Sequence, residues 1–291
     1  VLLWSPALGD YSRWHGDERF YVDAVAGMRA SGDWTTPVYP DGRPRFAKPL
    51  LSYWLIGLGE GAIGVSLPGA RLPFLIAGAM LVALTFSTAR HLLADDAAAL
   101  LASALVAGNA QIAALSTRAT PDILVCLGIT ASLHGVARAL GRSRARTSDA
   151  GWLWLASGVA VAAGGGLGLV APVFALGFLA ARRDSRLRAR DLVRVPFLAA
   201  GLAVAAAGVV APALRHGSAA FTGLLADQVA GRVETSALAP LAHLVVHLRS
   251  TVKNLAPWSL LVALAWLIAP RPLRVLVART RGAHALALGW W

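Results

Sequence analysis

Charged residues are scarce in this chain, and cysteine is almost absent from it. Only 14% of the 291 residues are charged and 57% are hydrophobic, whereas average soluble domains carry roughly 25% charged residues. The single cysteine, Cys126, lies in an apolar run. It cannot form an intramolecular disulfide, and its simplest role is that of a small packing residue. The composition therefore argues against a soluble domain.

Long apolar runs account for the scarcity of charge. Five runs contain no Asp, Glu, Lys or Arg, and a membrane-spanning helix needs about 20 apolar residues. A soluble protein of this size could not bury five such runs in one core. The sequence therefore predicts an all-α, polytopic membrane protein. The five runs are 72–89, 97–117, 151–181, 195–214 and 254–270.

The basic residues indicate how these helices are oriented. A net charge of +12 could suggest nucleic-acid binding, but the distribution of the charge argues otherwise. Of the 27 Lys and Arg residues, 14 lie in three short loops, 138–149, 182–194 and 271–281, each beside an apolar run. Cytoplasmic loops of membrane proteins carry such an excess. We therefore predict that these loops are cytoplasmic and that no nucleic acid is bound.

Counting crossings back from the first basic loop orients the N-terminal part. The preceding stretches 120–137, 97–117 and 72–89 cross in turn, which places Arg118 outside and residues 90–96 inside. Residues 10–48 are then external if residues 49–66 do not cross the membrane, and cytoplasmic if they do. In the first case, the site suggested below would lie on the external face of the plasma (inner) membrane.

The domain organisation follows from this topology. We expect one membrane domain over residues 1–291, with an external loop at 10–70 and transmembrane helices over 71–291. The chain begins without Met and stops inside an apolar run. We therefore expect further chain before Val1 and after Trp291.

Two stretches are unsuited to a single straight span. Residues 49–66 contain Glu60 and several glycines, which favours an interfacial or re-entrant helix. Residues 151–181 lie between two basic loops and must cross an even number of times. Their 31 residues give about 46 Å of helix, whereas two crossings need roughly 60 Å. We predict a short hairpin there, broken near Gly164-Gly165-Gly166 and Pro172.

An acidic cluster stands near the start of the external loop. Asp17, Glu18 and Tyr21 lie together ahead of an apolar helix. Acids are common at helix N-termini, where they accept hydrogen bonds from unpaired N–H groups. Spacing alone therefore fits either a helix cap or a functional site.

A cationic cluster follows in the same loop. Arg45 and Lys48 precede an aromatic amphipathic helix that contains Tyr53. Cations at the membrane face suit phosphate groups, and equally suit ordinary interfacial anchoring by Lys, Tyr and Trp.

Two further places carry polar chemistry. Arg118 and Asp122 stand at the outer end of a predicted span, where an ionisable residue is a functional candidate, although a local Arg–Asp pair fits as well. His243 and His247 share one helical face behind the segment 227–234 and could bind metal. Spacing reveals no third protein ligand for them.

The external loop resembles a known family. The stretch DERFYVDAVAGMRASGDW…PDGRPRFAKPLLSYW, residues 17–54, resembles the first external loop of lipid-linked-sugar glycosyltransferases. The match is to the bacterial branch of the protein O-mannosyltransferase superfamily, close to the lipid A aminoarabinose transferases. Four shorter elements look like the same family in the same order. They are TPDILV at 120–125, GGGLGLVAPV at 164–173, DQVAGR at 227–232 and LAPWSLL at 255–261.

The resemblance implies a multi-pass GT-C fold and an activity. Members transfer a sugar, with inversion, from a polyprenyl-phosphate donor to a lipid or protein acceptor outside the membrane. The family's acid of the first loop falls on Asp17, its second acid on Asp122 and its phosphate-facing lysine on Lys48. We therefore take as candidate catalytic residues Asp17, Asp122 and Glu18, and as candidate substrate-binding residues Lys48, Arg45, Arg118, Tyr21 and Tyr53.

The chain departs from the family pattern at three points. Ala47 stands where members often carry a Glu that is associated with metal, so a divalent metal stays open as a cofactor and no metal ligand is assigned. Phe20 replaces the Arg that often precedes the tyrosine of the first motif. Val170 and Ala171 stand in place of Lys-Gly before Pro172.

Other functions stay open at this point. A broken helix in the bilayer also suits a secondary transporter, although no matching second half is visible in the sequence. A protein O-mannosyltransferase-like enzyme and an inactive relative are further alternatives. The identity of the sugar and of the acceptor does not follow from the sequence.

Overall fold

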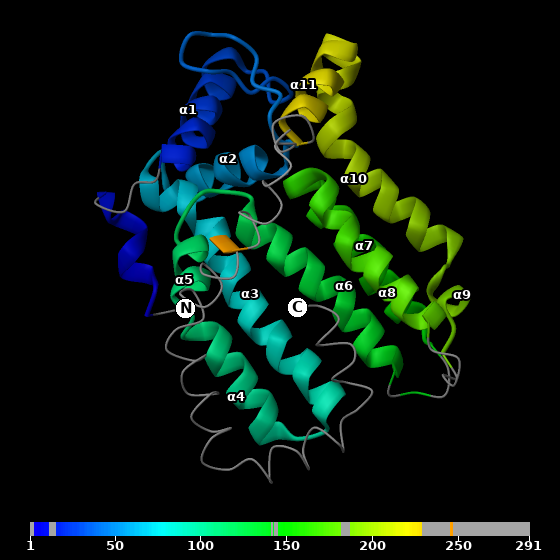
Figure 1. The fold of residues 1–291 in the computed structure, drawn as a ribbon. Helices are drawn as coiled ribbons and strands as arrows, with labels where there is room; N and C mark the ends of the chain where they lie inside the picture. The colour runs from blue at the N-terminus through cyan, green and yellow to red at the C-terminus, as the bar shows by residue number, and fades with distance from the viewer. Residues whose placement is uncertain are drawn as a thin grey trace.

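The computed structural model of the protein describes residues 3–11, 16–140, 142, 145–181, 187–228 and 245–246. Within these ranges regular structure is helical, apart from one isolated β-bridge between Val38 and Pro44 (Figure 1). The elements are η1 (Ser5–Gly9), α1 (Gly16–Ser31), α2 (Leu51–Ile63), α3 (Leu67–Leu93), α4 (Asp96–Ala107), α5 (Ala110–Ser116), α6 (Asp122–Leu140), α7 (Thr147–Gly164), η3 (Gly165–Leu169), α8 (Val170–Ala181), α9 (Ala189–Leu192), α10 (Val195–His216) and α11 (Ser218–Gln228).

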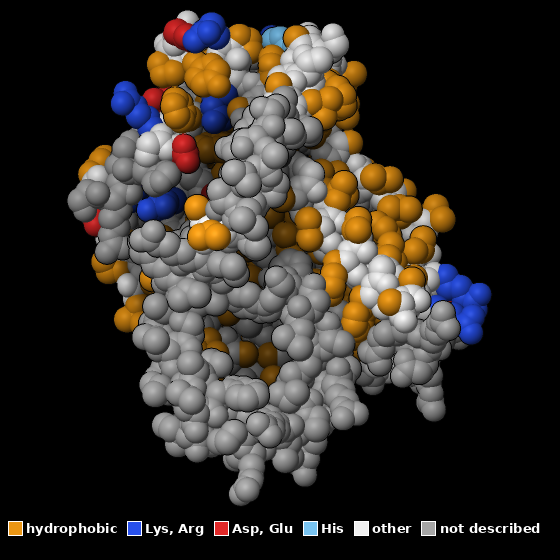
Figure 2. Space-filling view, in the orientation of Figure 1, with side chains coloured by type: hydrophobic (Ala, Val, Ile, Leu, Met, Phe, Trp, Pro, Cys, Tyr) orange, Lys and Arg blue, Asp and Glu red, His pale blue; other side chains and the backbone are white. Residues whose placement is uncertain are grey.

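Four helical stretches are long and apolar enough to cross a membrane. Three of them contain the predicted runs 72–89, 151–181 and 195–214, and the fourth overlaps the predicted crossing 120–137 but begins two residues later. The space-filling view shows hydrophobic side chains over the outer face of α10 (Figure 2), where Leu202 and Leu214 are 60% and 83% exposed. Such a surface suits lipid rather than water. The predicted all-α, polytopic class is confirmed. The four stretches are Leu67–Leu93, Asp122–Leu140, Thr147–Ala181 and Val195–His216.

The predicted run 97–117 is not one straight helix. It forms α4 and α5, which are bent by 63° relative to each other. Asn109 lies at the bend, and its side chain accepts hydrogen bonds from the N–H groups of Gln111 and Ile112. An uncharged cap of this kind starts a new helix without interrupting an apolar run, so a search for charges does not find it.

The long helices alternate in direction as the parity argument requires. Near one end of α3 and α6, Glu18 contacts both Arg71 and Ala119. Near the other end, Thr88 Oγ1 and His134 Nδ1 are 2.9 Å apart. Helices α3 and α6 therefore run in the same direction, and residues 90–96 lie at the opposite end of the bundle from α1.

The helices between Thr147 and Ala181 together are long and apolar enough to count as one candidate span. The chain nevertheless reverses its direction within this stretch. Gly165 has a φ of 72°, and a Cβ on Gly168 would lie 2.3 Å from the backbone nitrogen of Val161, so η3 folds back onto α7. Because α10 then packs parallel to α7, with Gly201 against Gly158, α8 must run in the return direction. The predicted hairpin is present. Pro172 lies in the first turn of α8 rather than at the break.

Helices α1 and α2 lie together at one end of the bundle (Figure 1). With 13 residues, α2 is not among the candidate spans, and its position in the membrane interface stays a prediction. Its Glu60 is buried and pairs with Arg29 of α1. A shared core of apolar side chains joins α1 and α2 to α3 and α6, and includes Met28, Ile56, Phe74 and Ile123. The predicted span 254–270 lies outside the described residues.

Candidate functional site

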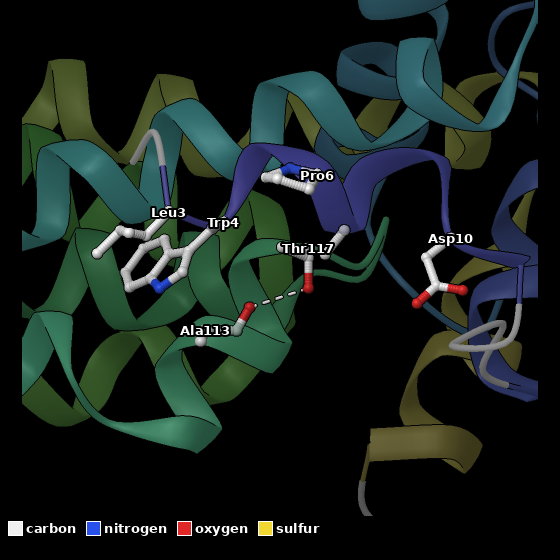
Figure 3. A pocket seen from close by; sticks show the side chains of 7 residues that line it. Leu3, Trp4, Pro6, Asp10, Ala113 and Thr117 are labelled. Carbon is white, nitrogen blue, oxygen red and sulfur yellow. Dashed lines mark hydrogen bonds between the residues drawn. The ribbon is translucent and has the colours of Figure 1, made fainter.

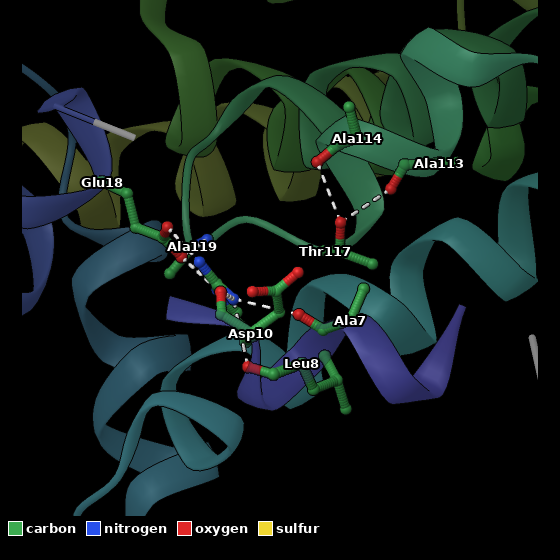
Figure 4. A network of polar contacts seen from close by, with 9 residues as sticks. Ala7, Leu8, Asp10, Glu18, Ala113, Ala114, Thr117 and Ala119 are labelled. Atoms are coloured by element: carbon green, nitrogen blue, oxygen red, sulfur yellow. Dashed lines mark hydrogen bonds and ion pairs between the residues drawn. The ribbon is translucent and has the colours of Figure 1, made fainter. Parts of the chain in front are cut away.

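A buried ion pair joins three distant segments at the α1 end of the bundle. Arg71 of α3 donates from Nε and Nη2 to the two carboxylate oxygens of Glu18 of α1, both at 2.7 Å, and neither side chain is exposed. Glu18 Oε1 also accepts a hydrogen bond of 2.8 Å from the backbone N–H of Ala119 (Figure 4). Glu18 therefore fixes the start of α1 against α3 and against the turn that leads into α6.

The remaining terminal nitrogen of Arg71 anchors the N-terminal segment. Its Nη1 donates to the carbonyl oxygens of Ala7, Leu8 and Asp10 at 3.0–3.1 Å. Next to this segment lies a cleft of about 210 Å³, where Leu3 and Trp4 of the N-terminal segment lie close to Ala113 and Thr117 (Figure 3). Its lining residues are Leu3, Trp4, Pro6, Ala7, Asp10, Ala113 and Thr117.

The same ion pair brings together the segments that carry the two predicted acids. Asp17 directly precedes Glu18, and Asp122 follows Ala119 by three positions as the first residue of α6; both acids are exposed. Tyr21 lies one helical turn after Asp17. The negative charge of Asp122 contributes to the raised pKa of the Tyr21 phenol, whose main cause is burial. Both acids therefore lie in the neighbourhood of Tyr21.

The alternative of a local pair at the start of α6 does not hold. Within the described part of the chain, Arg118 and Asp122 form no ion pair. Arg118 is half-buried in the turn before α6. It directly precedes Ala119, whose N–H binds Glu18. Arg118 therefore lies at the junction of the two acidic segments.

Arg45 lies inside a cluster of aromatic rings beside this junction. Its guanidinium carbon is 4.9 Å from the ring centroid of Tyr21 and 6.0 Å from that of Tyr53, and Nη1 donates to the Tyr53 hydroxyl. The Tyr21 and Tyr53 ring centroids are 5.3 Å apart. The structure thus brings together three of the predicted substrate-binding residues.

Lys48 lies between this aromatic cluster and α10. It is half-buried and stands two residues before Leu50, whose N–H donates to the carbonyl oxygen of Gly208 in α10 at 3.0 Å. The turn that carries Lys48 is therefore fixed against α10. Ala47 supplies no ligand, and the described residues contain no group of three His, Cys, Asp or Glu able to hold a metal ion. His243 and His247 lie outside the described residues.

Sequence reasoning missed Arg71 and Tyr39, two residues that contact the predicted site residues Glu18 and Arg45. Arg71 borders the apolar run 72–89, and a lone cation at the edge of a span is a signal that could have singled it out. Its partner Glu18 is 53 positions away, and no spacing rule connects them. Tyr39 lies in a turn without any motif, yet its ring centroid is 5.7 Å from the Arg45 guanidinium carbon.

Comparison with known proteins identifies relatives of this chain. The family model described as dolichyl-phosphate-mannose-protein mannosyltransferase matches residues 3–207. The undecaprenyl phosphate-alpha-4-amino-4-deoxy-L-arabinose arabinosyl transferase of Pseudomonas aeruginosa is 32% identical over 174 residues, which are 59% of this chain and 32% of the relative. The protein of the same name from Edwardsiella ictaluri is 30% identical over 165 residues, 56% of this chain and 30% of the relative.

Two crystal structures share the fold. The structures of ArnT from Cupriavidus metallidurans, apo and bound to undecaprenyl phosphate, superpose with TM-scores of 0.76 and 0.72 at 20% and 21% identity. Each covers 99% of this chain, and the chain covers 51% and 52% of them. This chain thus spans about a third of the length of the sequence relatives and about half of the solved structures. Because the family model covers most of the chain and the fold agrees, this protein belongs to the dolichyl-phosphate-mannose-protein mannosyltransferase family of the GT-C superfamily.

Proposed function

We propose that this protein is a membrane glycosyltransferase, which moves a sugar from a polyprenyl-phosphate donor to an acceptor on the external face. The observation that carries the proposal is the contact of Glu18 with both Arg71 and Ala119, which holds the segments of Asp17 and Asp122 at one end of the bundle. The names of the relatives include an undecaprenyl-phosphate sugar donor, and one similar structure binds undecaprenyl phosphate. Family membership favours this function over a transporter.

The residues supply the groups that such a transfer needs. Breaking a sugar–phosphate bond creates an oxocarbenium-like centre and a phosphate leaving group that keeps its negative charge. Fixed cations must stabilise that charge, and we assign Lys48 and Arg118 to this task. A hydroxyl acceptor needs a carboxylate base within hydrogen-bond reach. We assign that role to Asp17, with Asp122 orienting the acceptor or the developing positive sugar.

Glu18 has a different role in this proposal from that of a catalytic acid. Its carboxylate is fully buried, and both of its oxygens are held by Arg71. A substrate cannot reach it without breaking that pair. We therefore assign Glu18 to positioning Asp17.

A transfer assay tests the function and separates two acceptor classes. Membranes containing the full-length protein are incubated with undecaprenyl-phosphate donors that carry labelled 4-amino-4-deoxy-L-arabinose or labelled mannose. We expect label in lipid A with the first donor. Label in protein hydroxyls would favour the second candidate, a protein mannosyltransferase, which the family description itself suggests. No label above that of membranes lacking the protein, with either donor, would refute the proposed function.

We further propose that the α1 end of the bundle is external and that the protein lies in the inner membrane. The support is the placement of residues 90–96 and the first basic loop at the opposite end, together with the charge bias of the loops. The site would then open to the periplasm.

Cysteine labelling tests this orientation. In a Cys126→Ser background, we expect Asp41→Cys in the exposed turn after α1 to react with a membrane-impermeant maleimide in intact cells, because that turn would be external. Ser148→Cys, at the start of α7, serves as the matched control and should react only after the membrane is opened. The reverse pattern would overturn the topology.

A further inference from the structure

The C-terminal end of α10 contacts two parts of the loop that carries Lys48. His216 is the last residue of α10, and Gly217, with a φ of 63°, ends the helix. The Nε2 atom of His216 lies 2.7 Å from Oγ1 of the buried Thr36. The imidazole ring also packs against the Phe46 ring, with the two centroids 5.1 Å apart. A single side chain at the end of a candidate span therefore contacts the loop at two places.

The two contacted parts of the loop are joined to each other and to α10 by further bonds. The N–H of Arg45 donates to the carbonyl oxygen of Pro37 at 2.7 Å, and these two residues are chain neighbours of the pair that His216 contacts. Arg215, which precedes His216, forms an ion pair of 3.2 Å with Asp33 at the start of the loop. The start and the end of this loop therefore form one unit against the end of α10.

The chain is held by helices on both sides of Lys48. Two positions before it, Phe46 packs on α11, which follows α10 at this end of the bundle (Figure 1); a Cβ on Gly223 would lie 3.1 Å from the Phe46 Cβ. One position after it, the Pro49 Cβ would lie 3.3 Å from a Cβ on Gly208 of α10. Packing this close leaves the loop backbone little room to shift. The base of the Lys48 side chain is therefore fixed by α10 and α11 together.

We propose that His216 is a positioning residue for Lys48, which acts through Phe46 and does not touch the donor. Lysine carries its charge on a flexible four-carbon stem, so the place of the ammonium group depends on how firmly the backbone at its base is held. Histidine supplies both contacts at once, a ring face for Phe46 and a ring nitrogen for the Thr36 hydroxyl, which can donate or accept. The proposal rests on the proposed glycosyltransferase function, in which Lys48 stabilises the phosphate leaving group.

A double-mutant cycle in the full-length protein tests the proposal. The probe is undecaprenyl phosphate, because it carries the phosphate that leaves the sugar and its binding is measured without turnover. His216→Ala should raise its Kd about 5- to 10-fold, and kcat/KM for sugar transfer should fall by a similar factor. In a Lys48→Ala background, the same change should raise the Kd by less than about 2-fold, since residues that act through one another are not additive.

Two substitutions separate the contacts that His216 makes. His216→Phe keeps an aromatic ring for Phe46 and loses the nitrogen, whereas His216→Gln keeps a hydrogen-bonding group for Thr36 and loses the ring. Because the proposed route runs through Phe46, His216→Phe should bind undecaprenyl phosphate within about 2-fold of the wild type. His216→Gln should bind it as weakly as His216→Ala. A role in overall stability alone would not separate the two variants in this way.

A histidine at the opposite end of the bundle provides the matched control. His91 also lies in the last turn of a candidate span, and its ring packs on that of His134 with centroids 5.6 Å apart. His91→Ala should leave the Kd for undecaprenyl phosphate unchanged. If His216→Ala does not fold, Gly223→Ala disturbs the loop from α11, because its Cβ presses on Phe46, and should raise the Kd about 3-fold.

The contrary results are distinct from each other. An unchanged Kd in His216→Ala and in Gly223→Ala would overturn the positioning role. An equal rise of the Kd with and without Lys48 would show that His216 acts independently of the lysine, and weak binding by His216→Phe would overturn the route through Phe46. A wild-type protein that transfers no sugar would instead refute the proposed function, and the positioning role with it.

Discussion

Arg71→Met is expected to cost about 3–5 kcal/mol of the free energy of unfolding, because it leaves the Glu18 carboxylate buried without its cation. Both side chains are fully buried in the structure. The substitution also removes the donor that serves three carbonyl oxygens of the N-terminal segment. Thermal or chemical unfolding in detergent measures the effect, and loss of the α1 junction should abolish sugar transfer as well.

Two comparisons make this prediction specific. Arg19→Met removes an exposed ion pair with Asp23 on the same helix and should change stability by less than about 1 kcal/mol. Glu18→Gln combined with Arg71→Met should destabilise less than Arg71→Met alone, because no unpaired charge is then buried. If Arg71→Met unfolds like the wild type, the ion pair does not hold the junction together.

The directions of the helices relative to one another were predictable because they depend on counting the crossings between charged loops. The loop at 138–149 and residues 90–96 lie at one end of the bundle, as parity requires. The hairpin between residues 151 and 181 was predictable from the basic loops on both of its sides. The bend at Asn109 was not predictable from hydropathy. An uncharged cap inside an apolar run leaves the hydropathy unchanged, although it ends one helix and begins another.

The site was predictable only in part. Asp17, Asp122 and Lys48 follow from the resemblance, and the structure brings the segments of the two acids together. The contacts that do so were not predictable, since Glu18 pairs with a residue 53 positions away and binds a backbone N–H 101 positions away. Sequence identifies which residue types are present, whereas only folding shows that Glu18 and Arg45 are buried while Asp17 and Asp122 are exposed.

The buried and the exposed groups of the candidate site have different roles. The buried Arg71, Glu18 and Arg45 hold backbone segments and rings in place. The exposed Asp17 and Asp122 and the half-buried Lys48 and Arg118 are the groups that we assign to the substrate in the proposed function. Catalytic groups need to be held close to their productive geometry by surrounding residues, and the buried pair at the junction meets that need.

Asp17→Asn is expected to lower kcat for sugar transfer by about 100- to 10,000-fold when the acceptor is a hydroxyl, because a general base contributes a factor of that size. A phosphate acceptor is already ionised and needs no base, so Asp17 would then only position it, and the loss should stay below about 10-fold. The measured ratio, obtained with labelled undecaprenyl-phosphate 4-amino-4-deoxy-L-arabinose, therefore also reports the acceptor class.

Asp122→Asn should reduce turnover with either acceptor, because Asp122 faces the reacting sugar in the proposed arrangement. The double substitution should lose less than the product of the two single effects, since residues that share one substrate are coupled. Asp23→Asn is the matched control, because this half-buried acid of α1 pairs with Arg19 on its own helix; its turnover should equal that of the wild type. If Asp17→Asn and Asp122→Asn both fold and turn over normally, the two acids do not form a shared site. Family membership would then account for the fold, and the chemistry would have to be sought at other residues of the external face.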